Sequence, residues 1–236
     1  MSLMPVRIVA VLATLFSSSL WAQTFELLYA FPKDRSDGRR PTASLTAGPG
    51  GYLYGTTTEG GTHDAGTVFR VSTGGQVEIL NDFEENTTGR LPYGRLLNIG
   101  DGSLYGVSER NGNVAGNPSG TVYRLDEQGG LTALFQFPSG GNSPRKPRAL
   151  TSGEANTLHV ACFDPAGLWR VPLDGAAPSV ARLFGSTVTD GIFITSLIRG
   201  SDGLFYGTTQ AGGAKSLGTI FRIAPDGTGL TQLYSG

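Results

Sequence analysis

The chain has 236 residues, 36 of them glycine, and a formal net charge of -1. This charge balance excludes the strongly basic surface that attracts nucleic acid or anionic lipid. A single cysteine, Cys162, excludes an internal disulfide, and a glycine share about twice the usual ~7% favours many turns over long helices.

Residues 1–22 have the pattern of a secretory signal peptide. Arg7 gives a positive start, residues 8–16 are apolar, and small residues lead to Ala22, after which we expect cleavage. An uncleaved membrane anchor is disfavoured, because the apolar run is far shorter than the roughly 20 residues that span a bilayer. We therefore expect a secreted or cell-surface protein with no transmembrane segment after cleavage, whose folded domain is residues 23–236.

A pattern close to fifty residues long occurs four times in this domain. Each repeat has a leucine, then a tyrosine or histidine nine residues later, then an aromatic residue followed by arginine. The leucines are Leu45, Leu96, Leu150 and Leu197; their partners are Tyr54, Tyr105, His159 and Tyr206; the pairs are Phe69-Arg70, Tyr123-Arg124, Trp169-Arg170 and Phe221-Arg222. Such a period is typical of repeat proteins whose units bury their apolar faces against one another. The repeats are expected near 42–83, 93–137, 147–184 and 193–234, with an extra N-terminal strand at 24–31.

The first repeat predicts four β-strands separated by glycine-rich turns. Runs of aromatic and β-branched residues indicate the strands, and glycine pairs indicate the turns. The strands are expected at 42–45, 52–57, 66–71 and 77–80. The fourth strand carries a marker pair that occurs five times: Leu28-Tyr29, Leu80-Asn81, Leu134-Phe135, Leu183-Phe184 and Leu233-Tyr234. Four antiparallel strands in each repeat are typical of a propeller blade.

Apolar residues stand side by side within the predicted strands, as in Leu53-Tyr54 and Val68-Phe69. Neighbouring side chains of a strand point to opposite faces, so both faces of each sheet must be covered. The sequence therefore predicts an all-β fold, a β-propeller of four-stranded antiparallel blades with about four blades present. Gly55, Gly106 and Gly207 are predicted to mark close approaches of a neighbouring blade.

The marker at the N-terminus leaves two interpretations of how the propeller closes. Residues 24–31 resemble a fourth strand that has no blade of its own, whereas the last repeat already has a fourth strand at 230–234. Either the two strands compete for one place, or the sequence is the front part of a longer propeller. The second interpretation is favoured, because four blades are the low end of the usual ~4–8.

Two pairs of segments resemble the GloVer tandem repeat of exported bacterial proteins. They are residues 53–61 with 66–70, and their near-copies 205–213 with 218–222. The second repeat matches less well at Val107-Ser108, and the third matches least, at residues 159–162. The resemblance implies a surface-associated propeller, often with a C-terminal sorting anchor, and assigns no general catalytic activity.

No pattern of residues predicts a catalytic centre, a metal site or a cofactor. His159 stands at the repeated tyrosine position, so we expect a packed residue, and Cys162 is expected to be a small buried one. His63 and Asp64 could form an acid–base pair, although a solvated loop tip is the simpler interpretation. The arginines of the repeated pairs are expected to be stacked or ion-paired in the fold, and the basic run 145–148 to be solvated surface.

Loop lengths give the one positive indication of a binding surface. The connections between second and third strands, and between blades, should lie at one end of the propeller and vary in length, whereas the turns at the other end are short and uniform. Variable loops on a rigid frame commonly carry binding. The predicted recognition surface consists of His63, Asp64, Glu109, Arg110, Asn113, Arg145, Lys146, Asp164 and Lys215.

The favoured function is an exported, non-enzymatic propeller that binds a glycan or another envelope protein. One alternative is an extracellular polysaccharide lyase or hydrolase on the same frame. Such an enzyme needs convergent carboxylates or a histidine–tyrosine pair at the hub, and the repeats do not place acidic residues there regularly. A purely structural surface-layer component is the third alternative.

Overall fold

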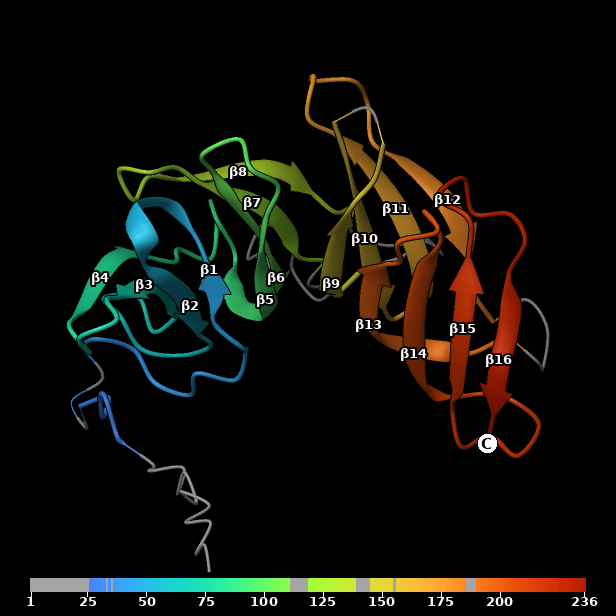
Figure 1. The fold of residues 1–236 in the computed structure, drawn as a ribbon, viewed down its shortest axis with the longest axis horizontal. Coiled ribbons are helices and arrows are strands. Elements are labelled where there is room, and N and C mark those ends of the chain that lie inside the picture. Colours follow the sequence, from blue (N-terminus) through green and yellow to red (C-terminus); the bar gives the residue numbers. More distant parts are fainter. Residues whose placement is uncertain are drawn as a thin grey trace, which may run out of the picture.

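Four antiparallel sheets of four strands each make up the fold (Figure 1). The computed structural model describes residues 26–32, 34, 36–110, 119–138, 145–154, 156–185 and 190–236. Blade 1 contains β1 (Thr46–Ala47), β2 (Leu53–Thr57), β3 (Thr67–Val71) and β4 (Val77–Asp82). Blade 2 contains β5 (Arg90–Asn98), β6 (Leu104–Arg110), β7 (Thr121–Leu125) and β8 (Leu131–Gln136). Blade 3 contains β9 (Pro147–Ser152), β10 (Thr157–Phe163), β11 (Ala166–Pro172) and β12 (Ser179–Leu183). Blade 4 contains β13 (Ile192–Arg199), β14 (Phe205–Ala211), β15 (Thr219–Ile223) and β16 (Thr231–Ser235).

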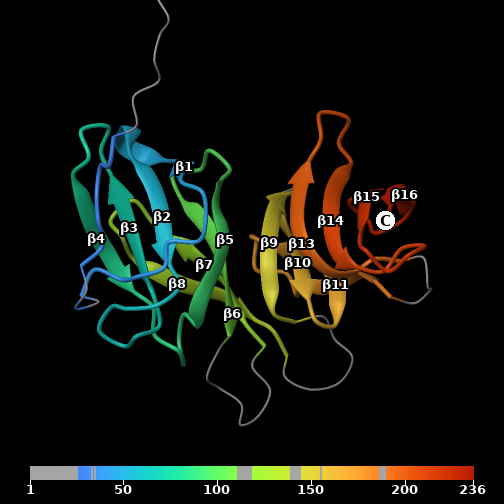
Figure 2. The same ribbon diagram turned by 90° about the horizontal axis from the view of Figure 1, so that it is seen from below.

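The first strands of the blades form the hub. In every blade the strands pair in chain order, so the first strand is an edge and the fourth is the opposite edge. Contacts join β1 to β5, β5 to β9, and β9 to β13, whereas the fourth strands lie at the periphery. The four blades fan out from this line of first strands and form an open arc, with blades 1 and 4 at its two ends (Figures 1 and 2). The predicted fold class is confirmed: the fold is all-β and propeller-like, although the described blades do not close into a ring.

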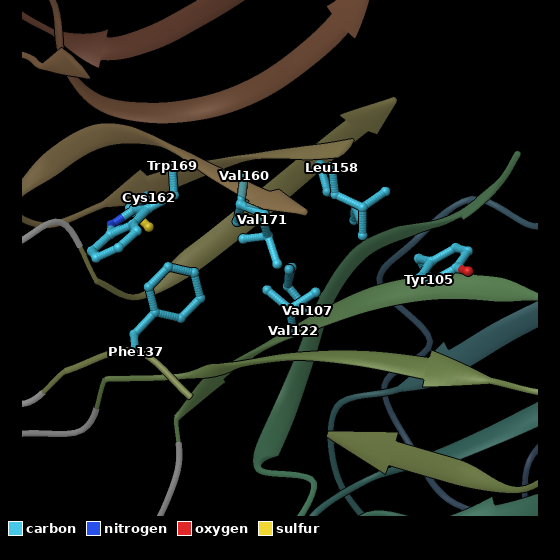
Figure 3. Close-up of a cluster of buried hydrophobic side chains, with 10 residues drawn as sticks. Tyr105, Val107, Val122, Phe137, Leu158, Val160, Cys162, Trp169 and Val171 are labelled. Carbon is cyan, nitrogen blue, oxygen red and sulfur yellow. The ribbon is translucent and has the colours of Figure 1, made fainter. Parts of the chain in front are cut away.

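Apolar side chains fill each junction between blades, as the side-by-side pattern predicted. Val68 and Phe69 are adjacent in β3, and both are buried, one on each face of the sheet. The same holds for the corresponding residues of β7 and β11. Figure 3 shows the junction of blades 2 and 3, where Val107 and Val122 meet Val160. Burial on both faces means that a blade is stabilised mainly by its neighbours.

A pair of aromatic rings bridges every junction near the periphery. The residue that follows the fourth strand of one blade contacts the aromatic residue in the third strand of the next. The ring centroids are 4.9 Å apart for Phe83–Tyr123, 5.7 Å for Phe137–Trp169 and 5.2 Å for Phe184–Phe221. Phe31 makes the same contact with Phe69 at 5.3 Å, from the N-terminal segment. Edge-to-face and tilted pairs of this kind add to the hydrophobic gain of burying the rings.

The repeated glycine lies under the same aromatic ring. Gly106 pairs with Tyr123 across β6 and β7, and a Cβ atom on Gly106 would come within 2.2 Å of the tyrosine ring. Gly55 and Gly207 stand in the same relation to Phe69 and Phe221. The prediction that a neighbouring blade comes close to these glycines is therefore wrong. The group that approaches is a cross-strand ring of the same sheet, which covers the bare backbone.

Two strand predictions, one for the first repeat and one for the segment before it, need correction. The strand expected at 42–45 lies at Thr46–Ala47, and Arg39 makes a separate bridge to Glu59, so the first strand of blade 1 is interrupted. Within the range expected for an N-terminal strand, 24–31, the described residues 26–31 are not assigned to a strand. A strand needs a hydrogen-bonded neighbour, and local sequence alone does not supply one.

The marker Leu183-Phe184 is two residues out of register with its counterparts. Arg182 pairs with Leu168 as Asn81 pairs with Val68, and a bulge precedes each of these pairs. Phe184 therefore occupies the position of Phe83, and its backbone N–H bonds to Ala166 as that of Phe83 bonds to Gly66. Because Leu183-Phe184 resembles the other marker dipeptides, the sequence alone does not show this difference of two positions.

Replacing Phe83 by alanine should remove the ring that joins blades 1 and 2. We expect the free energy of unfolding to fall by about 3–5 kcal/mol, because Phe83 is fully buried. Chemical denaturation measures this loss. Val180→Ala, at a partly exposed site on β12, is the control and should change stability by less than about 1 kcal/mol. Equal effects of the two substitutions would contradict the role of the ring.

Replacing Gly106 by alanine should force the ring of Tyr123 away from the sheet. We expect a loss of about 1–3 kcal/mol, from the strain of inserting a methyl group into a packed site. Gly74→Ala is the matched control, because its φ is not positive and the nearest atom to its added Cβ would be 3.8 Å away. Thermal unfolding should give a lower midpoint for Gly106→Ala than for Gly74→Ala. A Gly106→Ala protein as stable as the parent would contradict the close contact of Gly106 with the Tyr123 ring.

Candidate functional site

The strand order places two different kinds of connection at the two ends of the blades. At one end, which we call the turn end, short turns join the first strand to the second and the third to the fourth. At the other, the loop end, lie the connections between second and third strands and between blades. The loop between β2 and β3 spans residues 58–66, whereas Asp164 and Pro165 alone join β10 to β11. The loop end is thus the variable end of the described chain.

Four of the predicted surface residues come together at the loop end, where blades 2 and 3 meet. Lys146 Nζ lies 2.9 Å from Asp164 Oδ2, and the backbone N–H of Asp164 bonds to the carbonyl of Arg145. Glu109 is the fourth, and its Oε2 lies 3.2 Å from Nη2 of Arg148, a residue of β9. The side chains of Arg148 and Glu109 are only 19% and 15% exposed. The prediction that Arg148 belongs to a solvated basic run is therefore wrong.

Arg148 is the centre of a stack that crosses three blades. Its guanidinium group lies 3.6 Å from the ring centroid of Phe163 and 4.7 Å from that of Tyr93. The ring of Phe163 stacks on Phe193, with centroids 4.7 Å apart and planes 24° apart. We call Tyr93, Arg148, Phe163 and Phe193 the stacked column. A guanidinium group between aromatic faces is held by cation–π attraction and by its weak hydration.

The column lies beside a hollow that follows the hub. The first strands β5, β9 and β13 line a cavity of about 170 Å³, which includes Tyr93, Arg95, Arg148, Thr195 and Ser196. Tyr93, Phe163 and Phe193 are each only partly buried, so part of each ring surface is available to a ligand. Hydroxyl and guanidinium groups beside aromatic rings suit a ligand that has both apolar and hydrogen-bonding surfaces.

Unused hydrogen-bond donors add to the polarity of this region. Nε and Nη1 of Arg145 and Nε of Arg148 are buried and make no hydrogen bond within the described part of the chain. Buried donors without acceptors are unfavourable for the folded state. The charges nearby are Lys146, Arg95, Glu109 and Asp164.

A repeated backbone feature turns the chain at the loop end. One non-glycine residue at the entry to each first strand has a left-handed φ angle between 54° and 61°. These residues are Arg40, Leu91, Lys146 and Phe193. Because L-residues adopt this conformation with some strain, its recurrence in every blade indicates that the kink is built into the repeat. It gives Phe193 its place in the stacked column.

The other predicted site residues lie elsewhere. His63 and Asp64 are exposed in blade 1, where with Asp34, Ser36, Gly61 and Thr62 they line a separate open hollow of about 620 Å³. Arg110 is exposed at the end of β6, and Lys215 is exposed in the β14–β15 loop. Asn113 lies outside the described residues. The predicted residues therefore do not all lie together: Glu109, Arg145, Lys146 and Asp164 do, and the others that the structure describes lie apart from them.

Sequence reasoning missed the aromatic members of the column. Tyr93 follows a proline in β5, Phe163 ends β10, and Phe193 belongs to β13, three positions that do not correspond in the repeat. The periodic pattern therefore gave no signal for them. The basic run 145–148 is the one indication of the column in the sequence, since it places Arg148 close to Arg145 and Lys146 of the predicted recognition surface.

The arginines of the repeated pairs lie towards the turn end. Arg70 forms an ion pair with Glu78 at 2.7 Å and lies 4.5 Å from the ring centroid of Tyr52, as expected for a structural residue. Arg124 Nε donates a hydrogen bond to Ser103 at 2.8 Å. Arg170 and Arg222 are exposed. These arginines pair across the second and third strands with the repeated tyrosine or histidine, away from the stacked column.

His159 and Cys162 are packed residues, as predicted. Cys162 is fully buried, and burial raises the pKa of its thiol well above the usual value. His159 is also buried, and its Nε2 lies 2.9 Å from the carbonyl of Pro225 in blade 4. Burial lowers the pKa of His159 to about 4, so the ring is neutral at pH 7. Neither residue has the environment of a nucleophile or a base.

Within the described residues, no group of three or more histidine, cysteine, aspartate or glutamate side chains could hold a metal ion. No helix in that part of the chain is long and apolar enough to cross a membrane.

Sheets of four antiparallel strands, fanned about a common line of first strands, define this chain as a repeat protein of the β-propeller class. Residues 12–164 match the Gloeobacter/Verrucomicrobia repeat. The chain belongs to this family, which confirms the resemblance of the repeated segments. No curated protein matches the sequence.

Several solved structures share the fold at low sequence identity. A streptogramin B lyase is 16% identical with a TM-score of 0.56, over 80% of this chain and 52% of its own. A virginiamycin B lyase from Staphylococcus aureus is 17% identical with a TM-score of 0.56, over 80% and 54%. A gluconolactonase from Xanthomonas campestris is 17% identical with a TM-score of 0.54, over 81% and 61%. The chain thus spans about half to three fifths of these proteins, and the likeness shows the fold alone.

The neutral, buried state of His159 should make stability depend on pH. The unfolded chain takes up a proton below about pH 6.5, whereas the folded protein does so only near pH 4. The contribution of the neutral His159 to the unfolding free energy is fully present above pH 6.5. It is lost as the pH falls towards 4, by roughly 3 kcal/mol in total. We expect His159→Tyr, the residue of the other three blades, to lack this loss. Urea denaturation at pH 7, 6 and 5 measures it.

The comparison with the parent protein decides this prediction. If His159→Tyr and the parent protein lost stability in parallel between pH 7 and 5, the buried histidine would not be the cause.

Proposed function

We propose that this protein is an exported, non-enzymatic binding module that recognises a glycan at the loop end of the hub. The stacked column carries the proposal. Its aromatic rings are partly exposed and come from three blades, and Tyr93 and Arg148 of the column line a hollow that also presents arginine and hydroxyl groups. The C–H faces of a sugar ring pack well on aromatic side chains, while its hydroxyls need donors and acceptors around the rim.

The rigid setting of the column supports binding in place of catalysis. Arg148 is held by Glu109 and by two rings, and Asp164 is held by Lys146. Each nearby carboxylate is thus engaged by a cation, whereas glycoside hydrolysis needs one carboxyl group that carries a proton and a second that is free to act as base or nucleophile. We infer that the loop end holds a sugar chain without transforming it.

Export of the protein is part of the same proposal. The pattern of residues 1–22 predicts a cleaved signal peptide, although these residues lie outside the described part of the chain. A secreted or cell-surface location would bring the loop end into contact with envelope or environmental polysaccharides. An envelope protein as ligand is the alternative within this class.

An enzymatic function is the second candidate. It is favoured by the similar structures, which include two lyases and a gluconolactonase. On this account the hub would act on a polysaccharide or a related ester. A screen for product release from the polysaccharides that the protein binds would distinguish the two functions, since the binding module should leave them intact.

Replacing Tyr93 by alanine should weaken glycan binding. We expect the dissociation constant for the best ligand from a glycan array to rise about tenfold or more, as is usual when a central aromatic contact is removed. Isothermal titration calorimetry measures the change. Tyr52→Ala is the matched control, because Tyr52 makes the same contact with an arginine, 4.5 Å to the ring centroid, at the opposite end of the propeller.

Two outcomes would count against the proposal. If the array gave no ligand for the parent protein, the glycan hypothesis would fail. If Tyr93→Ala and Tyr52→Ala both bound like the parent, glycan binding would be real but would lie away from the stacked column.

A further inference from the structure

The hollow at the hub contains one cation that the fold leaves unpaired. Arg95 of β5 lines this hollow together with Tyr93 and Arg148. Its side chain is exposed, and its guanidinium group makes no ion pair and no hydrogen bond with any residue that the structure describes. Arg148, by contrast, is paired with Glu109 at 3.2 Å. Arg95 is therefore the charge of the hollow that is available to a ligand.

The repeat itself does not require an arginine at this position. The residue before the repeated leucine is Ser44 in the first repeat, Ala149 in the third and Ser196 in the fourth. Small side chains are therefore sufficient at this place in a first strand, and blade packing does not account for the long charged side chain of Arg95. A departure from the local pattern without a structural gain is expected at functional positions.

A bulge in β5 keeps Arg95 beside the next blade. The register of β5 against β6 shifts between Tyr93 and Leu97. Gly94 lies within this shift and has a φ angle of 68°, and a Cβ atom on it would be 2.5 Å from the backbone carbonyl oxygen of Arg148. The glycine thus allows the backbones of β5 and β9 to approach closely, directly before Arg95. Bulges of this kind commonly re-aim a side chain next to a binding site.

Positive charge exceeds negative charge around the hollow, although the whole chain has a net charge of -1. Among the described residues, two arginines and no acidic residue line it. The nearby carboxylate of Glu109 is engaged by Arg148 at 3.2 Å. That of Asp164 is engaged by Lys146 at 2.9 Å. The charge of Arg95 therefore stays uncompensated, and a hollow lined by one sign of charge attracts ligands of the opposite sign.

We propose that the glycan recognised at the hub is acidic, with the carboxylate of a uronic-acid residue bound to Arg95 and a sugar ring packed on Tyr93. This inference rests on the proposed glycan-binding function and adds the chemical class of the ligand. The planar guanidinium group matches a carboxylate with two parallel hydrogen bonds, and such a charge-assisted pair is stronger than a bond between neutral groups. Thr195 and Ser196 line the same hollow and supply hydroxyl groups for the neutral part of the sugar.

The test compares acidic oligosaccharides with their own neutral counterparts. The probes are oligomers of galacturonate, glucuronate, mannuronate and guluronate, each beside the form in which its carboxyl groups have been reduced to alcohols. Isothermal titration calorimetry should give a dissociation constant at least about tenfold lower for the best acidic probe than for its reduced form, because hydrogen bonds to charged groups are the stronger ones. Added salt should narrow this difference, since it screens the charges.

Substitutions assign the preference to Arg95. Arg95→Gln should abolish the preference for the acidic form and leave the affinity for the reduced form as it is in the parent. The variant should fold, because the side chain is exposed. Arg222→Gln is the matched control: Arg222 is exposed on β15 towards the turn end, so this variant should keep the full preference. Tyr93→Ala should weaken binding of both forms, since its ring contacts the sugar and not the charge.

The outcomes separate this inference from the function on which it rests. If acidic and reduced forms bound equally well and both depended on Tyr93, the glycan site would stand and its acidic specificity would be overturned. If Arg95→Gln kept the full preference, the carboxylate would have a different partner and the assignment to Arg95 would be wrong. If neither the probes nor any glycan of the array bound the parent protein, the proposed function itself would fail.

Discussion

The contact between aromatic rings at each blade junction is the constraint on which the fold depends. A single blade is apolar on both faces and has no core of its own, so it must be held between neighbours. Phe83 and its counterparts reach from the end of one blade to the third strand of the next, while the first strands meet at the hub. The ring contacts fix the spacing of neighbouring blades at the periphery, and the contacts between first strands fix it at the hub. Together they determine how the sheets are arranged relative to one another.

This fixed fan makes the candidate site possible. The stacked column takes its members from blades 2, 3 and 4, and no two neighbouring members of the stack belong to the same strand. Their rings can stack only if the blades are held at a constant spacing. Removing freedom from the scaffold is what allows a ligand to bind without a large ordering penalty. The same packing rule is met at blade 1 by the N-terminal segment, whose Phe31 contacts Phe69.

Much of the architecture was predictable because it repeats. Four leucines, four aromatic–arginine pairs and the glycine turns gave the strands and the blade count, and adjacent apolar residues such as Val68 and Phe69 gave burial on both faces. The errors in strand position fell where one repeat departs from the others. In the third repeat the dipeptide Leu183-Phe184 stands two positions later than the markers of the other repeats, and the broken first strand of blade 1 moved its start to Thr46.

The sequence by itself determined the class of fold, the family and the packed nature of His159 and Cys162, because each follows from local pattern and position in the repeat. Only the tertiary structure decided which residues meet. Phe163 and Phe193 occupy positions that correspond neither to each other nor to those of Tyr93 and Arg148, and a non-glycine residue with a left-handed φ angle turns the chain there. A periodic pattern records what every blade shares, whereas a site built across several blades depends on how those blades are placed in space.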